Sequence, residues 1–376
     1  MKLFDVYPML DVTIERGQGE RVFDKAGRDY LDLYGGHAVI SIGHTHPHYV
    51  ARLERQLHQI GFYSNAVHNE LQIGLAHHLG RLGEVDQYHL FLSNSGAEAN
   101  ENAIKMAAYH TGRSKFIAFR KSFHGRTSGT LGLTDSPRLQ TAFSASIPVL
   151  WHDLNDMSGI EEALSRGDVA AVIIEGIQGV GGIHVATDDF LRDLAACCKQ
   201  YHTPLILDEI QSGAGRTGKF FSFQSSGIEP DIITSAKGLG NGFPVGATLI
   251  HPSFEARHGL LGTTFGGNHL ACAAALAVLE VIEAEDLMTL ADRNGRYIMD
   301  ILRTIPGVLE VRGKGLMIGI QLDQSAAPIR KQLFERYRML TGNASDPNVV
   351  RLLPPLNVRR ESLDDFAAAL KNILES

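Results

Sequence analysis

The sequence has few cysteines and no long apolar run. Only three cysteines, Cys197, Cys198 and Cys272, occur among 376 residues, which is too few for a disulfide framework. We interpret them as small buried thiols in a reducing compartment. No apolar run reaches the roughly 18 residues of a membrane-spanning helix, and the first residues, MKLFDVYPMLD, lack the apolar stretch of a signal peptide. We therefore expect a cytoplasmic protein that makes no contact with a membrane.

The chain also lacks an excess of basic residues. It has 35 Lys and Arg against 42 Asp and Glu, and its net charge of −7 is spread along the sequence. Without a basic run, nucleic acid is not an expected partner. The apolar fraction of 44% and the charged fraction of 20% are typical of a globular protein with a sizeable core.

Short apolar runs alternate with helical patterns from about residue 88 to 250. The runs predict strands at 88–92, 115–119, 170–174, 205–208, 231–235 and 246–250. Between two of them, residues 189–201 place apolar side chains on one helical face. Such alternation predicts an α/β fold with a mostly parallel central sheet and helices on both faces. Ligands of such sheets bind outside the carboxyl ends of the strands.

The two ends of the chain have a different pattern. Turn residues around 17–19 and 25–27 separate short alternating runs, which predict a small antiparallel hairpin, and a long helix at about 269–284 leads into a mixed C-terminal region. We expect residues 1–50 to form the N-terminal segment of a small α+β domain. Residues 51–255 then form a large α/β domain, and residues 256–376 complete the small domain.

A polar stretch, Ser93–Asn100, follows the strand at 88–92 and begins a helical pattern. Ser95 and Glu98 have the spacing of a capping box, which by itself explains both residues. Gly96 allows the backbone to approach an anion at the helix N-terminus, so a phosphate site is the functional alternative.

Two charged residues follow other strands. Asp208 ends an apolar strand, and because a buried carboxylate is costly unless paired, it either caps a loop or pairs with a protonated nitrogen of a ligand. Lys237 is the only formal charge between Asp231 and Glu255. Removal from water lowers the pKa of a lysine and makes its amine a nucleophile; extension to the surface is the structural alternative. A phosphate site, a carboxylate for a ring nitrogen and a lysine for an aldehyde together indicate pyridoxal 5′-phosphate.

Five motifs extend this argument. The sequence resembles the class III aminotransferases, which belong to the fold-type I pyridoxal-phosphate enzymes, and most of all the acetylornithine and succinylornithine aminotransferases of arginine metabolism. The resemblance runs from about Val12 to Pro355. Its motifs, in family order, are Ser95–Asn100, Phe123–Thr127, Leu207–Gly213, Ser235–Gly242 and Thr263–Asn268.

The resemblance implies a role for each candidate residue. Lys237 would hold the cofactor covalently and later move the proton, and Asp208 would keep the pyridine nitrogen protonated. The other implied cofactor contacts are Ser95, Gly96, Ala97, Phe123, Ile210 and Gln211, together with Thr264 of the neighbouring subunit. A homodimer with shared active sites follows from that last contact.

The resemblance also implies the substrates. Arg126 would bind the α-carboxylate of an N²-acylornithine, Arg351 would bind the α-carboxylate of 2-oxoglutarate, and Thr263 would touch the substrate. The planar guanidinium suits both arginines to a carboxylate, and a structural ion pair is the alternative for each. The terminal amine would pass to 2-oxoglutarate and give glutamate. Ornithine, 4-aminobutyrate and acyl-lysine are alternative donors.

One stretch departs from the family pattern. Relatives commonly have Pro where this chain has Gly176, and Glu where it has Val180. In those relatives the glutamate covers the second arginine while the amino donor is bound. Here either another acid covers Arg351, or Arg351 stays uncovered and helps to bind the donor. The second option motivates the hypothesis that the acyl group is succinyl rather than acetyl.

Other classes of protein fit the sequence less well. Gly213–Lys219 matches the start of a phosphate-binding loop, which would indicate a nucleotide hydrolase, but Phe220 stands where Ser or Thr must bind Mg²⁺. Gly238–Gly242 lacks the third glycine of a dinucleotide site. His44, His46 and His48 surround a predicted turn, and we expect no metal there. A catalytically inactive partner protein is disfavoured because Lys237, Asp208 and Arg126 are all present.

Overall fold

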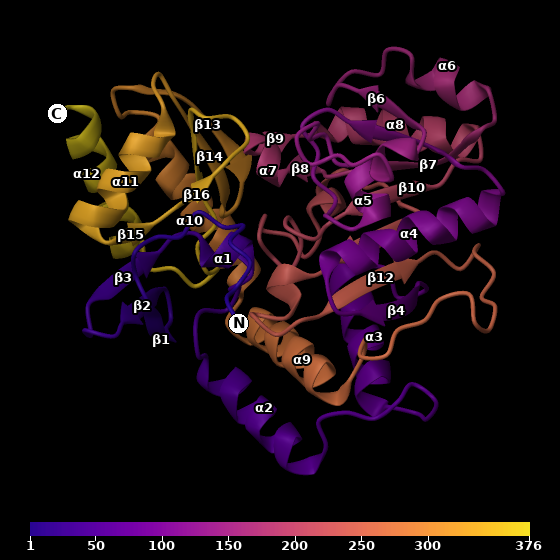
Figure 1. Ribbon diagram of the computed structural model, residues 1–376, viewed down its shortest axis with the longest axis horizontal. Helices are drawn as coiled ribbons and strands as arrows, with labels where there is room; N and C mark the ends of the chain where they lie inside the picture. Colours follow the sequence, from indigo (N-terminus) through magenta and orange to yellow (C-terminus); the bar gives the residue numbers. More distant parts are fainter.

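A seven-stranded sheet forms the larger part of the computed structural model, which describes residues 1–376 (Figure 1). In spatial order its strands are β4 (His89–Ser93), β12 (Gly246–Ile250), β11 (Ile232–Ser235), β10 (Leu205–Asp208), β7 (Val169–Ile174), β5 (Lys115–Phe119) and β6 (Val149–His152). The six strands expected from the sequence are all present, and β6 is an addition. Only β12 runs antiparallel to its neighbours, because the short connection from β11 leaves no room for a crossover. The predicted fold class is confirmed.

Helices cover both faces of this sheet. Successive side chains of a strand point to opposite faces, so Ile206 packs with α4 (Gly96–Thr111), whereas Leu205 and Leu207 pack with α8 (Asp188–Gln200). The face of α8 also receives α3 (Glu70–Gly83) and α9 (His269–Ala284), the helix expected at 269–284. The strands are therefore buried on both faces, and only their ends are available for a ligand.

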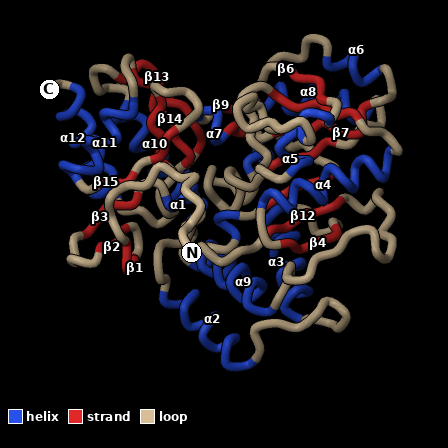
Figure 2. Tube along the Cα trace, in the orientation of Figure 1, coloured by secondary structure: helices blue, strands red, loops and turns tan.

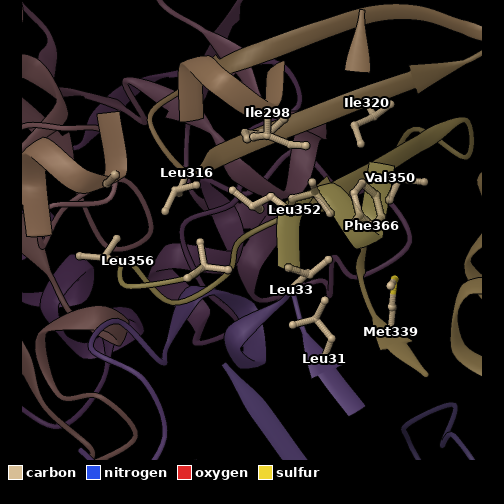
Figure 3. Packing of buried hydrophobic residues seen from close by; sticks show 14 of the residues in the cluster. Leu31, Leu33, Ile298, Leu316, Ile320, Met339, Val350, Leu352, Leu356 and Phe366 are labelled. Carbon is tan, nitrogen blue, oxygen red and sulfur yellow. The ribbon is translucent and has the colours of Figure 1, made fainter. Parts of the chain in front are cut away.

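The two chain ends build a second, smaller lobe around one core. Leu31 and Leu33 of the N-terminal segment pack with Val350, Leu352 and Phe366 of the C-terminal region (Figure 3). The antiparallel strands β1 (Ile14–Gln18), β2 (Arg21–Asp24) and β3 (Asp29–Asp32) form a sheet with β15 (Met339–Leu340), and the order of the other sheet is β13 (Val308–Lys314), β14 (Met317–Leu322), β17 (Val349–Leu352) and β16 (Gly342–Asn343). A small α+β unit made from both ends is confirmed.

The remaining elements connect or cover these sheets (Figure 2). The longer ones are α2 (Pro47–Gln59), α10 (Leu287–Leu302), α11 (Ala326–Tyr337) and α12 (Arg360–Leu374). The shorter ones are α1 (Gly35–Ala38), α5 (Ser128–Gly132), α6 (Ile160–Ser165), α7 (Gly179–Gly182), β8 (Ile177–Gln178), β9 (His184–Val185) and three 3₁₀ turns at Ser144–Ser146, Ser222–Ser225 and Lys237–Leu239. None of the helices combines the length and the apolar character needed to cross a membrane.

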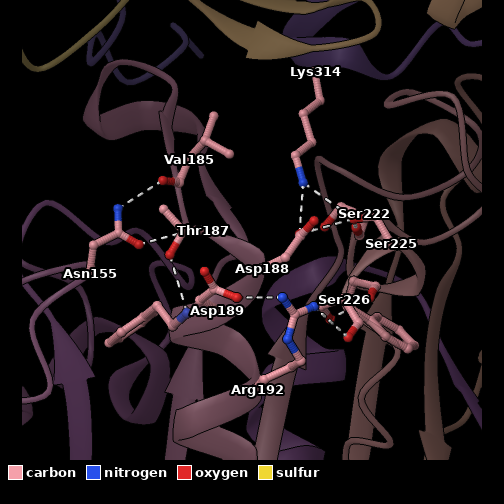
Figure 4. Close-up of polar contacts among 12 residues, drawn as sticks. Asn155, Val185, Thr187, Asp188, Asp189, Arg192, Ser222, Ser225, Ser226 and Lys314 are labelled. Atoms are coloured by element: carbon pink, nitrogen blue, oxygen red, sulfur yellow. Dashed lines mark hydrogen bonds and ion pairs between the residues drawn. The ribbon is translucent and has the colours of Figure 1, made fainter.

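A polar contact joins the two lobes beside α8. Lys314, at the tip of the small-lobe hairpin, donates to Asp188 Oδ1 at 3.1 Å and to Ser225 Oγ at 3.2 Å (Figure 4). Thr187 caps the same helix, since its hydroxyl accepts from the backbone N–H of Phe190 at 3.1 Å. The small lobe is thus held against the beginning of a helix that covers the central sheet.

Candidate active site

A cavity of about 410 Å³ opens at the carboxyl ends of β10 and β11, beside the beginning of α4. This is where ligands of mostly parallel sheets bind. Most of the candidate residues line it: Ser95, Gly96, Ala97, Phe123, Arg126, Asp208, Ile210, Gln211 and Lys237. Residues far apart in the sequence therefore meet because their strands end at the same edge of one sheet.

The carboxylate of Asp208 is held from behind by three hydrogen-bond partners. Its Oδ2 accepts from Asn100 Nδ2 at 2.7 Å and lies 2.8 Å from His124 Nδ1, and its Oδ1 accepts from the backbone N–H of Ile210 at 3.1 Å. Asn100 is itself oriented by Thr234, whose hydroxyl donates to its amide oxygen at 2.7 Å. No Lys or Arg pairs with Asp208, so this buried acid is prepared for a positively charged ligand atom.

Lys237 begins the 3₁₀ turn after β11 and has a left-handed backbone with φ of 44°. Its side chain lines the cavity. Burial lowers the pKa of its ammonium group, while the charges of Asp208 and Glu175 oppose this shift. The lowered pKa makes the free amine more available as a nucleophile.

The beginning of α4 brings the backbone close to the cavity. Ser95 caps the helix by accepting from the backbone N–H of Glu98 at 3.2 Å, and Glu98 Oε2 accepts from the backbone N–H of Asn94 at 2.9 Å. Ser95 is therefore the N-cap of α4, as expected, but the Glu98 carboxylate accepts from the N–H of Asn94 and not from that of Ser95, so the capping box is incomplete. A Cβ atom at Gly96 would lie 2.7 Å from a methyl carbon of Ile210, so only glycine fits there. The first N–H groups of a helix have no intrahelical acceptor and favour an anion.

Glu175 is a second buried acid on the cavity wall. It accepts from the backbone N–H groups of Phe123 at 2.8 Å and Gly179 at 3.0 Å. Burial raises its pKa to about 7, and the nearby charge of Asp208 adds to this increase, although His124 and the two N–H groups act in the opposite direction. Glu175 therefore fixes the backbone on both sides of the cavity while it titrates near neutral pH.

The two candidate arginines have different environments. Arg126 is exposed at the cavity and forms no ion pair. Arg351, on β17, is 2% exposed and does not line the cavity. Its guanidinium donates to the carbonyl oxygens of Gly179 at 2.8 Å and Asn343 at 2.5 Å. Burial lowers the pKa of Arg351.

This environment corrects one expectation. We expected that Arg351 either has another acid in place of the missing glutamate or stays uncovered, but the structure shows neither. The guanidinium is covered by neutral oxygens, and Val180 lines the cavity beside it. The carbonyl of Val180 accepts from the hydroxyl of Ser345 at 2.8 Å, so its turn is attached to the small lobe. Because Arg351 is not open, the reason for preferring a succinyl group is removed.

Two candidates lie outside the cavity of their own chain. Thr263 does not line the cavity, but its hydroxyl accepts from Nδ2 of Asn94, which does, at 3.5 Å and from the backbone N–H of Gly266 at 3.0 Å. Thr264 is exposed on the same loop, beside Phe265, whose side chain is 60% exposed. Neither threonine is among the residues that line the cavity with Lys237.

The rival motifs also have defined positions. His44, His46 and His48 contact three different carboxylates, those of Asp32, Glu285 and Glu280, at 2.8, 2.8 and 2.6 Å. Gly213–Lys219 leads into the 3₁₀ turn Ser222–Ser225 and not into the helix that follows a phosphate-binding loop. Arg216 in this segment is buried and donates to the carbonyl oxygens of Leu316 and Pro354.

The sequence did not predict the residues that position the candidate side chains of the cavity. Asn100 and His124 lie inside two of the quoted motifs, but nothing in their spacing indicates that both reach Asp208. Glu175 directly follows the buried strand β7, a position that could have identified it. The cavity is completed by residues with no chemical signal of their own, including Val39, Gly242, Phe243, Pro244 and Val245.

Comparison with known families agrees with this geometry. The family model described as aminotransferase class-III matches residues 5–374. The chain therefore belongs to the class-III aminotransferases, and it is an enzyme that transfers amino groups.

The individual relatives carry narrower names than the family model. The chain is 42% identical over 382 residues to the acetylornithine aminotransferase of Halalkalibacterium halodurans, covering 99% of this chain and 98% of the relative. It is 39% identical over 381 residues to that of Bacillus cereus, with 99% and 97% covered.

Solved structures show the same fold. N-acetylornithine aminotransferase from Stenotrophomonas maltophilia superposes with a TM-score of 0.83 at 35% identity, covering 98% of this chain and 97% of that one. Ornithine aminotransferase from Toxoplasma gondii, described with pyridoxal phosphate at partial occupancy in its active site, superposes with a TM-score of 0.91 at 30% identity, covering 99% and 92%.

Proposed function

We propose that this aminotransferase uses pyridoxal 5′-phosphate to move the terminal (5-) amino group of an N²-acylornithine to 2-oxoglutarate. The products are N-acylglutamate 5-semialdehyde and glutamate. The observation that carries the proposal is that one cavity combines Asp208, Lys237 and the N-terminus of α4. The acyl group of the named relatives is acetyl, and we retain acetyl and succinyl as the two candidates.

The residues fit this cofactor. Asp208 is a carboxylate without a basic side-chain partner other than His124, so it suits a protonated pyridine nitrogen. His124 lines the cavity, and its Nε2 is buried without a partner. Gly96 and Ala97 offer backbone N–H groups to a phosphate, and Ser95 lies beside them. Phe123, Ile210 and Gln211 complete the walls around the ring.

Lys237 is proposed to act as the base and acid of the reaction. Pyridoxal phosphate, when bound, supplies a ring that draws electrons from the substrate carbon that loses its proton. The amine of Lys237, with its lowered pKa, removes that proton and later returns it to a neighbouring atom.

The arginines and threonines are proposed to bind substrates. Arg126 is free to hold the α-carboxylate of the acylornithine. Arg351 is proposed to hold the α-carboxylate of 2-oxoglutarate after it exchanges some of the neutral oxygens that cover it. Thr264 is proposed to reach the phosphate of the neighbouring subunit, with Thr263 near the substrate, which requires a homodimer. Sedimentation velocity under turnover conditions tests this requirement, and a fully monomeric active enzyme would contradict it.

An absorbance titration tests the proposal as a whole. The purified protein, supplied with pyridoxal phosphate, is titrated with N²-acetylornithine, N²-succinylornithine, ornithine and 4-aminobutyrate. We expect the visible absorbance of the lysine-bound cofactor to disappear with an acylornithine and to return with 2-oxoglutarate. If only ornithine or only 4-aminobutyrate removes this absorbance, that compound is the amino donor and the acylornithine is not. No cofactor absorbance at all would overturn the enzyme assignment.

A further inference from the structure

A second cavity, of about 450 Å³, lies outside the carboxyl ends of the neighbouring parallel strands β5 and β6. Arg120 and Lys121 directly follow β5, and Asp153 directly follows β6. The small lobe supplies another wall through Glu310 and Arg312 of β13. This interlobe cavity therefore lies at the edge of the sheet where ligands of mostly parallel sheets bind, as the cavity around Lys237 does.

The hairpin of β8, α7 and β9 separates the two cavities. Val180 of α7 lines the cavity around Lys237, whereas Gln178 before this helix and His184 after it line the interlobe cavity. In Figure 1, α7 and β9 lie where the two lobes meet. No residue lines both cavities, so a ligand of the interlobe cavity does not occupy the active site.

The interlobe cavity carries charges of both signs. Three cationic side chains and two carboxylates line it: Arg120, Lys121, Arg312, Asp153 and Glu310. Arg312 donates to Glu310 Oε2 at 2.7 Å, whereas the ammonium group of Lys121 and the carboxylate of Asp153 form no hydrogen bond or ion pair. Only two of the ten lining residues are hydrophobic. Unpaired groups of both signs are therefore available to a polar ligand.

His184 adds a polar atom without a partner. Its Nε2 is buried and forms no hydrogen bond. A Cβ atom at Gly182 would lie 3.6 Å from this nitrogen and 3.3 Å from Arg312 Nη2, so the imidazole and the guanidinium lie close together. Burial lowers the pKa of His184, and the charges of Arg312 and Lys121 lower it further, so the ring is neutral at neutral pH. An unpaired buried nitrogen indicates that a polar partner is missing there.

We propose that the interlobe cavity binds the zwitterion of a polar α-amino acid. Lys121 holds its carboxylate, with Arg120 beside it, and Asp153 and Glu310 receive its ammonium group. A simple anion would meet the two carboxylates and a simple cation would meet the three cations, whereas a zwitterion pairs with charges of both signs. The proposal does not depend on the proposed function, because none of these residues lines the cavity around Lys237.

L-Serine and its two halves test the charge requirement. 3-Hydroxypropionate lacks the ammonium group of serine, and ethanolamine lacks its carboxylate. Isothermal titration calorimetry with the protein loaded with pyridoxal phosphate should give a Kd for serine about tenfold lower than for either half, as for one more hydrogen bond to a charged group. The visible absorbance of the cofactor should not change during this titration. Equal affinity for serine and one of its halves, or an absorbance change with the same midpoint as the heat, would overturn the proposal.

Variants of the cavity test the residues. Lys121→Gln and Asp153→Asn each remove one charge at similar size, and we expect each to raise the Kd for serine roughly tenfold. His184→Phe keeps a ring without the unpaired nitrogen and should raise it about fivefold. Lys199→Gln and Asp193→Asn, both exposed on α8 and outside the cavity, are the matched controls and should bind serine as the parent does. No binding of serine by the parent, an unchanged Kd in Lys121→Gln and Asp153→Asn, or an equal increase in the controls would overturn the proposal.

Discussion

The two ends of the active site are built in different ways. At one end, Asp208 is held by short bonds from Asn100 and His124, all within the large lobe. At the other end, Arg351 comes from the small lobe and is covered in part by two long bonds to Gln211 and Tyr34. The first end is held by short bonds within one lobe, whereas the second is proposed to exchange its neutral acceptors for a carboxylate.

This difference matches the chemistry proposed for each end. A ring that stays in place through both half-reactions needs a partner that does not move. A site that first receives an amine donor and then a keto acid needs contacts that are easily replaced. The variants below probe the fixed end and its connection to the exchangeable one.

Replacement of Lys237 should have the largest effect. Lys237→Ala removes the nucleophile and the proton carrier together, so we expect kcat to fall by roughly 10³-fold or more while the fold is retained. Steady-state kinetics measure kcat, and circular dichroism shows whether the fold is retained. Lys219→Ala, an exposed lysine outside the cavity, is the control and should keep its activity. An active Lys237→Ala variant would refute the assignment.

Asp208→Asn tests the fixed end directly. The amide keeps the size of the side chain but cannot stabilise a protonated ring nitrogen, so we expect kcat to fall on the order of 10²-fold. Asp231→Asn is the matched control, because Asp231 accepts from the backbone N–H of Leu205 at 2.8 Å at the opposite end of the same strand. The Asp231→Asn variant should have a lower melting temperature than the parent but a similar kcat. Equal kinetic losses in both variants would show that Asp208 has only a structural role.

Gly96→Ala should have a smaller effect. The added Cβ atom would press against Ile210 where the phosphate is proposed to bind, so we expect the Kd for pyridoxal phosphate to rise about tenfold, as for the loss of one hydrogen bond to a charged group. Equilibrium titration of cofactor-free protein measures this change. Gly74→Ala, on α3, meets no atom within 4 Å and should bind the cofactor as the parent does.

The smallest effect concerns stability. The pKa of Glu175 is about 7 in the folded protein and near 4.5 when unfolded, so its protonation stabilises the fold fully below about pH 4.5. This contribution is lost as the pH rises through 7. Glu175→Gln cannot titrate, so its melting temperature should fall less than that of the parent between pH 5 and pH 8 in cofactor-free protein. Glu335→Gln, exposed on α11, should show the same fall in melting temperature between pH 5 and pH 8 as the parent. A fall of that size in Glu175→Gln would contradict the prediction.

Much of the site could be predicted because its residues sit in fixed positions relative to strands. Asp208 and Lys237 follow apolar runs, and a strand that precedes a polar residue defines the edge of the sheet at which that residue lies. Ser95 and Gly96 are likewise defined by the beginning of a helix. Local patterns of this kind are contained in a few neighbouring residues.

The surroundings of Arg351 could not be predicted in the same way. The missing glutamate at Val180 was visible in the sequence, but the neutral oxygens that cover the guanidinium come from separate segments of the chain. Tyr34 and His37 carry no motif that relates them to Arg351, and the left-handed turn of α1, which follows Tyr34 and contains His37, has two residues other than glycine.

The sequence by itself determined the α/β class, the strands that end at the active edge and the aminotransferase motifs, because periodicity and residue chemistry are local properties. Only the tertiary structure decided which side chains hold Asp208, what covers Arg351 and how the N-terminal turn meets the cavity. Many of these contacts join distant positions of the chain, such as Asn100 with Asp208 inside the large lobe and Tyr34 with Arg351, and those around Arg351 also depend on how the two lobes pack against each other.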